Sequence, residues 1–228
     1  MVVLHLGGGR DQSRVACILP DARVLCVDID HEAVKEHPAD WRIIADAARL
    51  PLKSASCNLV LCEHVFEHLT EPTAVIGEIA RVLRLGGRML FTTPNRYGYV
   101  ALLGRLTPHR WHAWWNRKRG VADQDTFPTA YRLNTVRAID RECIRAGLKR
   151  EWAEMMEWAP IYLRPIPAAY VVGMLVFAVI ARIRAARPLW TSIVGCYRKE
   201  PCSPGVGLVS APPVGLKGAG RMRQDEVQ

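Results

Sequence analysis

Short apolar runs that alternate with helix-length segments are the feature that most limits how this chain can fold. Val2–Leu6 is a run of β-branched and aliphatic residues that ends in three glycines, and Arg23–Val27 is a second run that ends in Asp28. Further strand candidates are Arg42–Ala45, Cys57–Cys62 and Arg88–Thr92. Because helix-length segments separate these runs, the pattern predicts a parallel α/β sheet with ligands at the carboxyl ends of its strands.

Two helices and two further strands are expected beyond these runs. Thr73–Arg84 carries apolar residues at helical spacing, and we expect Gly86 and Gly87 to stop this helix. The other expected elements are a helix over Asn134–Ala146 and strands over Leu148–Trp158 and Ser192–Lys199.

The length of 228 residues fits one domain with insertions, which we expect over residues 1–200. A basic, aromatic insertion at 95–130 and an apolar segment at 159–190, between the last two strands, would interrupt it. Residues 201–228 are rich in Gly, Pro and Ser and lack periodicity, so we expect a disordered tail.

The amino-acid composition indicates the cellular environment of the protein and the kinds of partner that it could bind. The seven cysteines are odd in number, have no Cys-x-x-Cys spacing and mostly lie in apolar runs, which favours reduced, buried thiols and no metal site. The first nine residues lack a secretory signal, so we expect a cytoplasmic protein. The net charge of +9 predicts attraction to nucleic acid, an anionic membrane surface or a phosphorylated substrate.

A glycine turn and an acid follow the first two strands. Gly7, Gly8 and Gly9 allow tight turning and a close approach of backbone N–H groups to a ligand. Asp28, at the end of the next strand, could accept two hydrogen bonds from a ribose diol. Gln12 stands where the dinucleotide fingerprint has a glycine, so the pair favours an adenosine-type ligand over NAD. The alternative is a simple tight loop with Asp28 as a helix cap.

Acids and imidazoles also follow the third and fourth strands. Asp46 could accept a hydrogen bond from the exocyclic amine of an adenine, or could be a solvated loop acid. The run Cys62–His68 brings two imidazoles and two carboxylates to the same edge. His64 and His68 would share a helix face, but a third metal ligand is missing, so each is either a general base or a hydrogen-bonded structural histidine.

In this order, the motifs resemble class I S-adenosylmethionine-dependent methyltransferases of the type-11 group, which includes quinone-biosynthesis enzymes. The runs that carry the resemblance are Val3–Gly9, Val27–Asp30, Ala45–Pro51, Asn58–Leu61, Glu67–His68 and Arg81–Phe91. The resemblance implies a Rossmann-like, seven-stranded sheet, mostly parallel with an antiparallel last strand. It also implies S-adenosylmethionine on the glycine turn, Asp28 at the ribose, and Asp46 with Ala47 at the adenine.

Two residues depart from this family. The family has an acid where His5 stands, which helps to hold the methionine amino group of the cofactor, and a histidine supplies no fixed negative charge. We therefore expect Asp or Glu in place of His5 to tighten cofactor binding. The family's third glycine is Asp11, which would crowd the cofactor carboxylate. These departures keep open a non-catalytic scaffold built on a degenerate methyltransferase fold.

An uncharged segment, Ile166–Ala181, is shorter than the ~20 residues that span a bilayer. Aromatic and basic residues flank it: Trp158, Tyr162, Arg164, Arg182, Arg184, Arg187 and Trp190. This pattern predicts a segment that rests in an anionic membrane interface, and the alternative is a buried helix in a core or a dimer seam. Trp111, Trp114 and Trp115 lie in the basic insertion, where the neighbouring apolar segment favours a lid or a membrane contact over nucleic acid.

The sequence thus predicts a cytoplasmic enzyme, peripheral on the inner face of the membrane, that transfers a methyl group to a lipid, a quinone or a lipid-linked glycan precursor. If the acceptor must lose a proton, His68 is the first candidate base and His64 the second. The alternatives are a soluble methyltransferase of RNA or small molecules, and the non-catalytic scaffold.

Overall fold

The computed structural model describes residues 1–9, 19–99, 101, 129–156, 160, 163 and 165–201. Several features predicted from sequence lie outside the described residues. They are Asp11, Gln12, most of the basic insertion with its tryptophans, the flanking residues Trp158, Tyr162 and Arg164, and the tail beyond residue 201.

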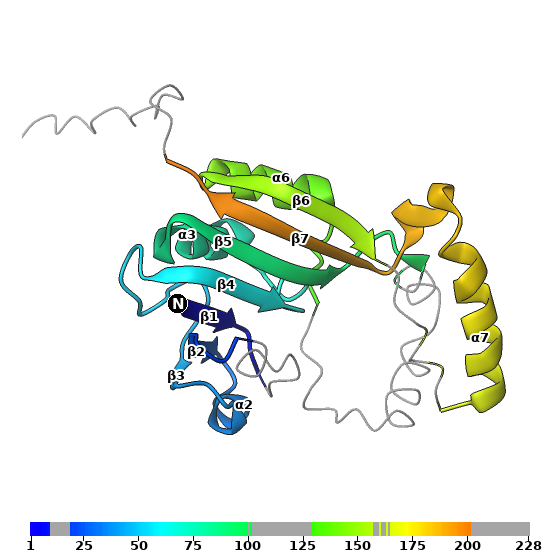
Figure 1. Cartoon of the computed structure of the whole chain (residues 1–228), viewed down its shortest axis with the longest axis horizontal. Coiled ribbons are helices and arrows are strands. Elements are labelled where there is room, and N and C mark those ends of the chain that lie inside the picture. Colours follow the sequence, from blue (N-terminus) through cyan, green and yellow to red (C-terminus); the bar gives the residue numbers. More distant parts are fainter. Residues whose placement is uncertain are drawn as a thin grey trace, which may run out of the picture.

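In the described part of the chain, seven strands form one sheet in the order β3-β2-β1-β4-β5-β7-β6 (Figure 1). The strands are β1 (Val2–Leu6), β2 (Arg23–Asp28), β3 (Trp41–Ile44), β4 (Cys57–Glu63), β5 (Leu83–Pro94), β6 (Leu148–Met156) and β7 (Ser192–Lys199). The first five pair in parallel, and β7 runs antiparallel to both β5 and β6. This topology confirms the predicted sheet, mostly parallel with an antiparallel last strand.

The described helices connect these strands. They are α2 (His31–Glu36), α3 (Pro72–Val82), α6 (Val136–Arg145), α7 (Pro167–Ile180) and a 3-10 helix, η3 (Arg184–Leu189). The prediction that Gly86 and Gly87 stop α3 is wrong. The helix ends at Val82, because Leu83 is already extended and pairs with Cys57 at the start of β4. The two glycines lie inside β5, where a Cβ on Gly87 would meet the Arg84 and Asn58 carbonyl oxygens at 2.9 and 3.1 Å.

The main core lies between the sheet and the helices α3 and α6. Ile76 and Ile79 of α3 and Ile139 of α6 are fully buried there against strand residues. The rings of Phe66 and Phe91 stack with their centroids 5.0 Å apart. Side chains alternate along β1, so that Leu4 and Leu6 join this core while Val3 joins a smaller cluster with α2. This packing holds the carboxyl ends of the parallel strands in fixed register.

The cysteines of the described residues are buried, as their apolar sequence context predicts. Cys26, Cys57, Cys62, Cys143 and Cys196 are all free thiols. Burial raises the pKa of the Cys62 and Cys143 thiols far above the usual range and that of Cys196 to about 11. These thiols are therefore protonated packing groups.

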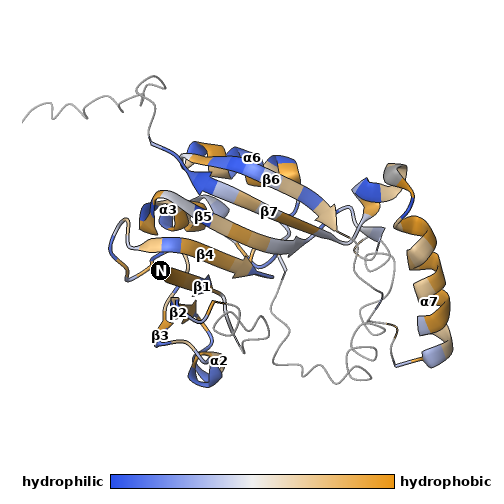
Figure 2. Ribbon diagram, in the orientation of Figure 1, coloured by the Kyte–Doolittle hydropathy of each residue, from blue (hydrophilic) through white to orange (hydrophobic). Residues whose placement is uncertain are grey.

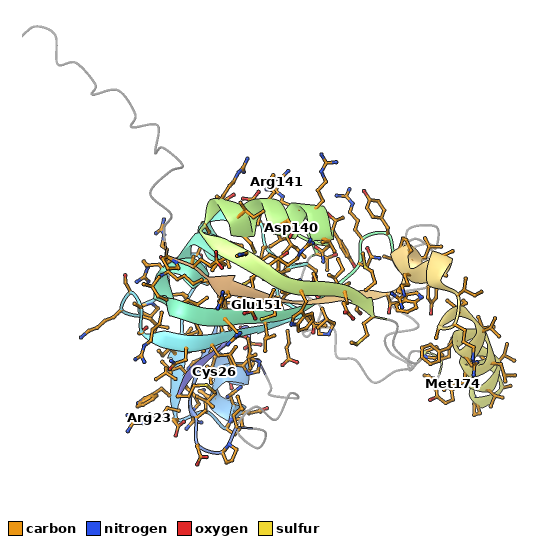
Figure 3. The ribbon with its side chains drawn as sticks, turned by 45° about the horizontal axis from the view of Figure 1, so that its top comes forward. Arg23, Cys26, Asp140, Arg141, Glu151 and Met174 are labelled. Atoms are coloured by element: carbon orange, nitrogen blue, oxygen red, sulfur yellow. The ribbon has the colours of Figure 1, made fainter. Side chains whose placement is uncertain are left out.

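Helix α7 stands apart from the sheet, on the side to which the carboxyl ends of β4 and β5 point (Figure 1). Figure 2 shows most of the helix as hydrophobic, and Met174 in its middle lies well away from the strands in Figure 3. No α7 residue is buried among the residues described, which argues against the alternative of a core helix. No helix of the described ranges is long and apolar enough to cross a bilayer.

Candidate functional site

Strand register brings the predicted site residues to one edge of the sheet. Leu6, the last residue of β1, pairs with Val27 of β2 and with Cys62 of β4. Asp28, at the end of β2, pairs with Ile44 at the end of β3. The glycine turn, Asp28 and the segments after β3 and β4 therefore all begin at the same carboxyl edge.

The glycine turn packs closely on the sheet. Gly7 and Gly9 have positive φ angles of 66° and 48°, which residues with a side chain rarely adopt. A Cβ on Gly7 would collide with the Val65 side chain, and one on Gly8 would meet two imidazole nitrogens and the Cys26 sulfur at 2.9–3.0 Å. Among the residues that the structure describes, a Cβ on Gly9 would touch only the Asp28 carboxylate, at 3.7 Å. Within that part of the chain, the turn leaves room at Gly9, and this fits a ligand that approaches the backbone closely.

Asp28 is held in place by backbone donors. The Gly9 N–H donates to its Oδ2 at 2.8 Å, and the Asp30 N–H donates to its Oδ1 at 2.9 Å. Each carboxylate oxygen keeps a further lone pair, so the group could still accept the two hydroxyls of a ribose. The alternative role as a helix cap is wrong, because Asp30 caps α2 by accepting from the N–H groups at 32 and 33. Ile29 beside it is exposed and offers an apolar surface for a flat base.

The loop after β3 carries Asp46 and Ala47. The exposed Asp46 side chain accepts the Ala48 N–H at 2.9 Å, which closes a local turn. Arg81 of α3 anchors the loop farther along, where its guanidinium donates to the Leu50 and Leu52 carbonyls at 2.9 and 2.7 Å. The Asp46 carboxylate keeps one oxygen that this turn does not use, so both predicted roles, adenine contact and loop acid, remain compatible with the geometry.

The segment after β4 forms turns, so the prediction that His64 and His68 share a helix face is wrong. His64 has a φ of 57°, and its backbone N–H donates to the Thr92 carbonyl at 2.9 Å as the chain leaves the sheet. His68 is half-buried, with its backbone N–H bonded to the Val65 carbonyl at 3.0 Å. In the described part of the chain, no three His, Cys, Asp or Glu side chains are arranged to hold a metal ion.

His64, one of the two candidate bases, has a buried carboxylate beside it. Its Nδ1 lies 3.3 Å from Oε1 of the buried Glu67, and the hydrogen bond to Glu67 raises the pKa of the exposed His64 ring. Glu67 Oε2 accepts the Thr93 hydroxyl at 3.2 Å, and Thr93 Oγ1 accepts the Asn134 amide at 2.7 Å. This network fixes the carboxylate and, through it, the orientation of the imidazole.

His5, the residue that departs from the resemblance, is buried under the glycine turn. Its Nδ1 lies 3.0 Å from Nε2 of the buried His37, and its Nε2 lies 3.5 Å from Oε2 of Glu63. Sequence reasoning placed Glu63 at this edge of the sheet, but it did not single out His37 or the contacts of either residue with His5. One signal was available, because an imidazole inside a buried strand needs a polar partner.

Comparisons with known proteins agree with this arrangement. Residues 4–91 match a family described as a methyltransferase domain. A "probable S-adenosylmethionine-dependent methyltransferase" of Mycobacterium tuberculosis is 36% identical over 106 residues, which cover 45% of this chain and 37% of the relative. A ubiquinone biosynthesis O-methyltransferase of Idiomarina loihiensis is 27% identical over 121 residues, 49% of this chain and 50% of that protein. The match thus spans half or less of the length of these two relatives.

Solved structures show the same fold. A geranyl diphosphate C-methyltransferase of Streptomyces coelicolor, solved with S-adenosyl-L-homocysteine, has a TM-score of 0.55 at 13% identity, over 87% of this chain and 70% of its own. The YcgJ protein of Bacillus subtilis has a TM-score of 0.53 at 17% identity, over 88% and 92%. Residues 4–91 therefore resemble a methyltransferase domain, and the described part of the chain has the class I methyltransferase fold.

Proposed function

We propose that this protein transfers the methyl group of S-adenosylmethionine to a lipid-type acceptor, which is a lipid, a quinone or a lipid-linked glycan precursor. The observation that carries the acceptor class is helix α7, which is uncharged, unburied and on the side of the sheet where the site opens. The ubiquinone-pathway relative, whose name gives a quinone-type product, supports the same class.

The cofactor part of the proposal rests on the carboxyl edge of β1, β2 and β3. The N–H groups of the glycine turn, the Asp28 carboxylate and the loop at Asp46 and Ala47 would hold the nucleoside and its amino acid. When bound, S-adenosylmethionine supplies a methyl group activated by its positively charged sulfur. The main task of the protein is then alignment, because holding two reactants in line removes most of the entropic part of the barrier.

His64 is the better supported base if the acceptor must lose a proton. Its Nδ1 faces Glu67, so Nδ1 carries the proton of the neutral ring and Nε2 keeps a lone pair. Nε2 would take the proton from the acceptor hydroxyl or amine as that atom bonds to the methyl carbon and the bond from carbon to sulfur breaks. His68, ranked first from sequence, is half-buried with its backbone N–H on the Val65 carbonyl, and we keep it as the second candidate.

The surroundings of α7 supply a place for an apolar tail. A cavity of about 450 Å³ lies along the helix, lined by Val172, Val176 and Phe177 together with Pro160 and Leu163. Cavities of this size and apolar lining are typical of sites for hydrophobic small molecules. The acceptor would enter here while the outer face of α7 rests on an anionic membrane, where the basic residues that follow the helix meet headgroups.

Methyl labelling tests this function. The purified protein is incubated with S-adenosylmethionine that carries a labelled methyl group and with lipid, polar-metabolite or RNA fractions from cells that lack the gene. We expect label in the lipid fraction alone, and less label with Asp28→Ala at low concentrations of S-adenosylmethionine. Label in RNA or in polar metabolites would overturn the acceptor class. No label in any fraction, together with no thermal stabilisation by S-adenosylhomocysteine, would favour the non-catalytic scaffold.

A further inference from the structure

The turn after β3 that carries Asp46 is fixed at its first end by the sheet. Ile44, the last residue of β3, pairs with Asp28 of β2, and the Ala45 N–H donates to the Asp28 carbonyl at 3.1 Å. The Arg49 N–H then donates to the Asp46 carbonyl at 2.9 Å, which closes the turn. The position where the turn begins is therefore set by pairing with β2, the strand that also carries the candidate ribose acid.

Helix α3 fixes the second end of the turn through Glu78 and Arg81. The Leu50 N–H donates to Glu78 Oε2 at 2.7 Å, and the Leu50 carbonyl accepts from Arg81 Nη2 at 2.9 Å. The Leu50 side chain is buried in the main core. Both backbone polar groups of this residue therefore bond to one helix, and residues 45–49 are held between two fixed ends.

Glu78 and Arg81 form a pair that we call the α3 clamp. Arg81 Nε donates to Glu78 Oε1 at 2.7 Å, and Nη2 donates to Oε2 at 2.8 Å. The guanidinium also donates to the carbonyls of Leu50 and Leu52 and, at 3.3 Å, to Ser54 Oγ. All five N–H groups of a guanidinium are thus in use. The hydrogen bonds from Arg81 lower the pKa of the Glu78 carboxyl, so the clamp is an ion pair at neutral pH.

We infer that Glu78 and Arg81 are positioning residues for the base of the cofactor, because they fix the turn that would bring Asp46 to the adenine. This inference rests on the proposed function, since it concerns the same cofactor. A carboxylate selects one base over another only from a fixed position, because a hydrogen bond weakens steeply as its geometry departs from the best. The clamp bonds to backbone groups at Leu50, so its effect reaches the ligand through the turn.

Two ligands separate this role from a general role in the fold. S-adenosylhomocysteine and its 6-deamino analogue differ only in the exocyclic amine of the base, which the analogue lacks. By calorimetry, we expect the wild type to prefer S-adenosylhomocysteine by about tenfold or more, because a hydrogen bond to a charged group forms in only one complex. Arg81→Lys should lower this preference severalfold, since an ammonium cannot replace the planar set of donors. A loss of stability alone would weaken both ligands equally.

A matched control and a graded pair of variants accompany this change. Arg88 of β5 forms a similar two-bond pair with Glu151, at 2.8 and 3.0 Å, so Arg88→Lys removes the same kind of contact elsewhere and should leave the preference unchanged. Glu78→Ala should act like Arg81→Lys. Glu78→Gln should keep more of the preference, because its amide oxygen could still accept the Leu50 N–H.

The outcomes separate the inference from the function on which it rests. An unchanged preference in Arg81→Lys and Glu78→Ala would overturn the inference, as would an equal loss of preference in Arg88→Lys. A wild type that binds both ligands equally would also overturn it, while the cofactor assignment would stand. If Arg81→Lys and Glu78→Ala fail to fold in a thermal melt, Glu78→Gln decides alone. A wild type that binds neither ligand would overturn the proposed function, and the inference with it.

Discussion

Helix α7 offers a test in which folding and membrane binding respond differently to the same change. Leu175 and Val179 are 66% and 58% exposed, so only about a third to two-fifths of each side chain contacts the protein. Fully burying such a side chain is worth about 1.5–3 kcal/mol. The double change Leu175→Ser with Val179→Ser should therefore lower the free energy of unfolding by only about 1–2 kcal/mol.

The cost to membrane binding should be larger. The exposed part of both side chains is what a lipid surface would cover, and its loss amounts to about 3 kcal/mol, or roughly a hundredfold in partitioning. The assay is co-sedimentation with vesicles that contain anionic lipid, at low and high salt, beside a thermal melt with S-adenosylhomocysteine. Salt should weaken wild-type binding only in part, because screening acts on the arginines and leaves apolar burial intact.

A matched control variant tests whether weaker vesicle binding comes from the change in α7 or from the loss of any exposed apolar side chains. Leu85 on β5 and Ile144 on α6 are 65% and 67% exposed, so changing both to Ser removes a similar apolar area elsewhere. We expect this control to sediment like the wild type. Equal release of both double variants, or a wild type that stays in the supernatant, would refute the membrane role of α7. An α7 variant that melts far earlier and loses its ligand would show that the helix is part of a core.

Three further outcomes are expected at the site. Asp28→Ala should weaken S-adenosylhomocysteine and methylthioadenosine alike, by about 1.5–3 kcal/mol in calorimetry, because both carry the ribose. Gly8→Ala should lower the melting temperature and weaken both ligands, since its Cβ would lie within 3.0 Å of the two imidazoles below. Glu67→Gln should move the acid limb of the pH–rate profile to lower pH, because Glu67 raises the pKa of His64 and a base works only when unprotonated; an unmoved limb would remove His64 as the base.

Much of the fold was predictable because local pattern and long-range pairing agree in it. The runs before the glycine turn and before Asp28 are strands, and β7 has the predicted bounds. The sequence pattern gave the wrong helix end where strand pairing with a distant residue determined the backbone conformation. Leu83 is extended because Cys57 pairs with it, although the helical spacing continues through it and glycines follow. A rule that predicts the end of a helix from nearby residues cannot include the pairing of Leu83 with a strand residue twenty-six positions earlier.

The segment after β4 shows a second kind of limit. A spacing of four between His64 and His68 predicts one helix face only if the segment is helical. The strand instead runs on to Glu63, and His64 turns in a left-handed conformation with its N–H on the Thr92 carbonyl. The sequence predicts which residue types lie at this edge, but it does not predict that His64 pairs with Glu67. The Glu67 carboxylate is held by Thr93 of β5, which in turn accepts from Asn134 in the segment before α6.

Position 5 shows what a comparison of residue types, taken alone, leaves out. From sequence, His5 is a lost acid, and an Asp or Glu there should restore it. In the fold, His5 is buried between His37 and the Glu63 carboxylate. An acid at that position would accept from His37 but would place a second carboxylate beside that of Glu63. Two carboxylates this close disfavour each other's charge, so one of them would take up a proton. Any gain in cofactor binding from Asp or Glu at position 5 is therefore opposed by the charge of Glu63 beside it.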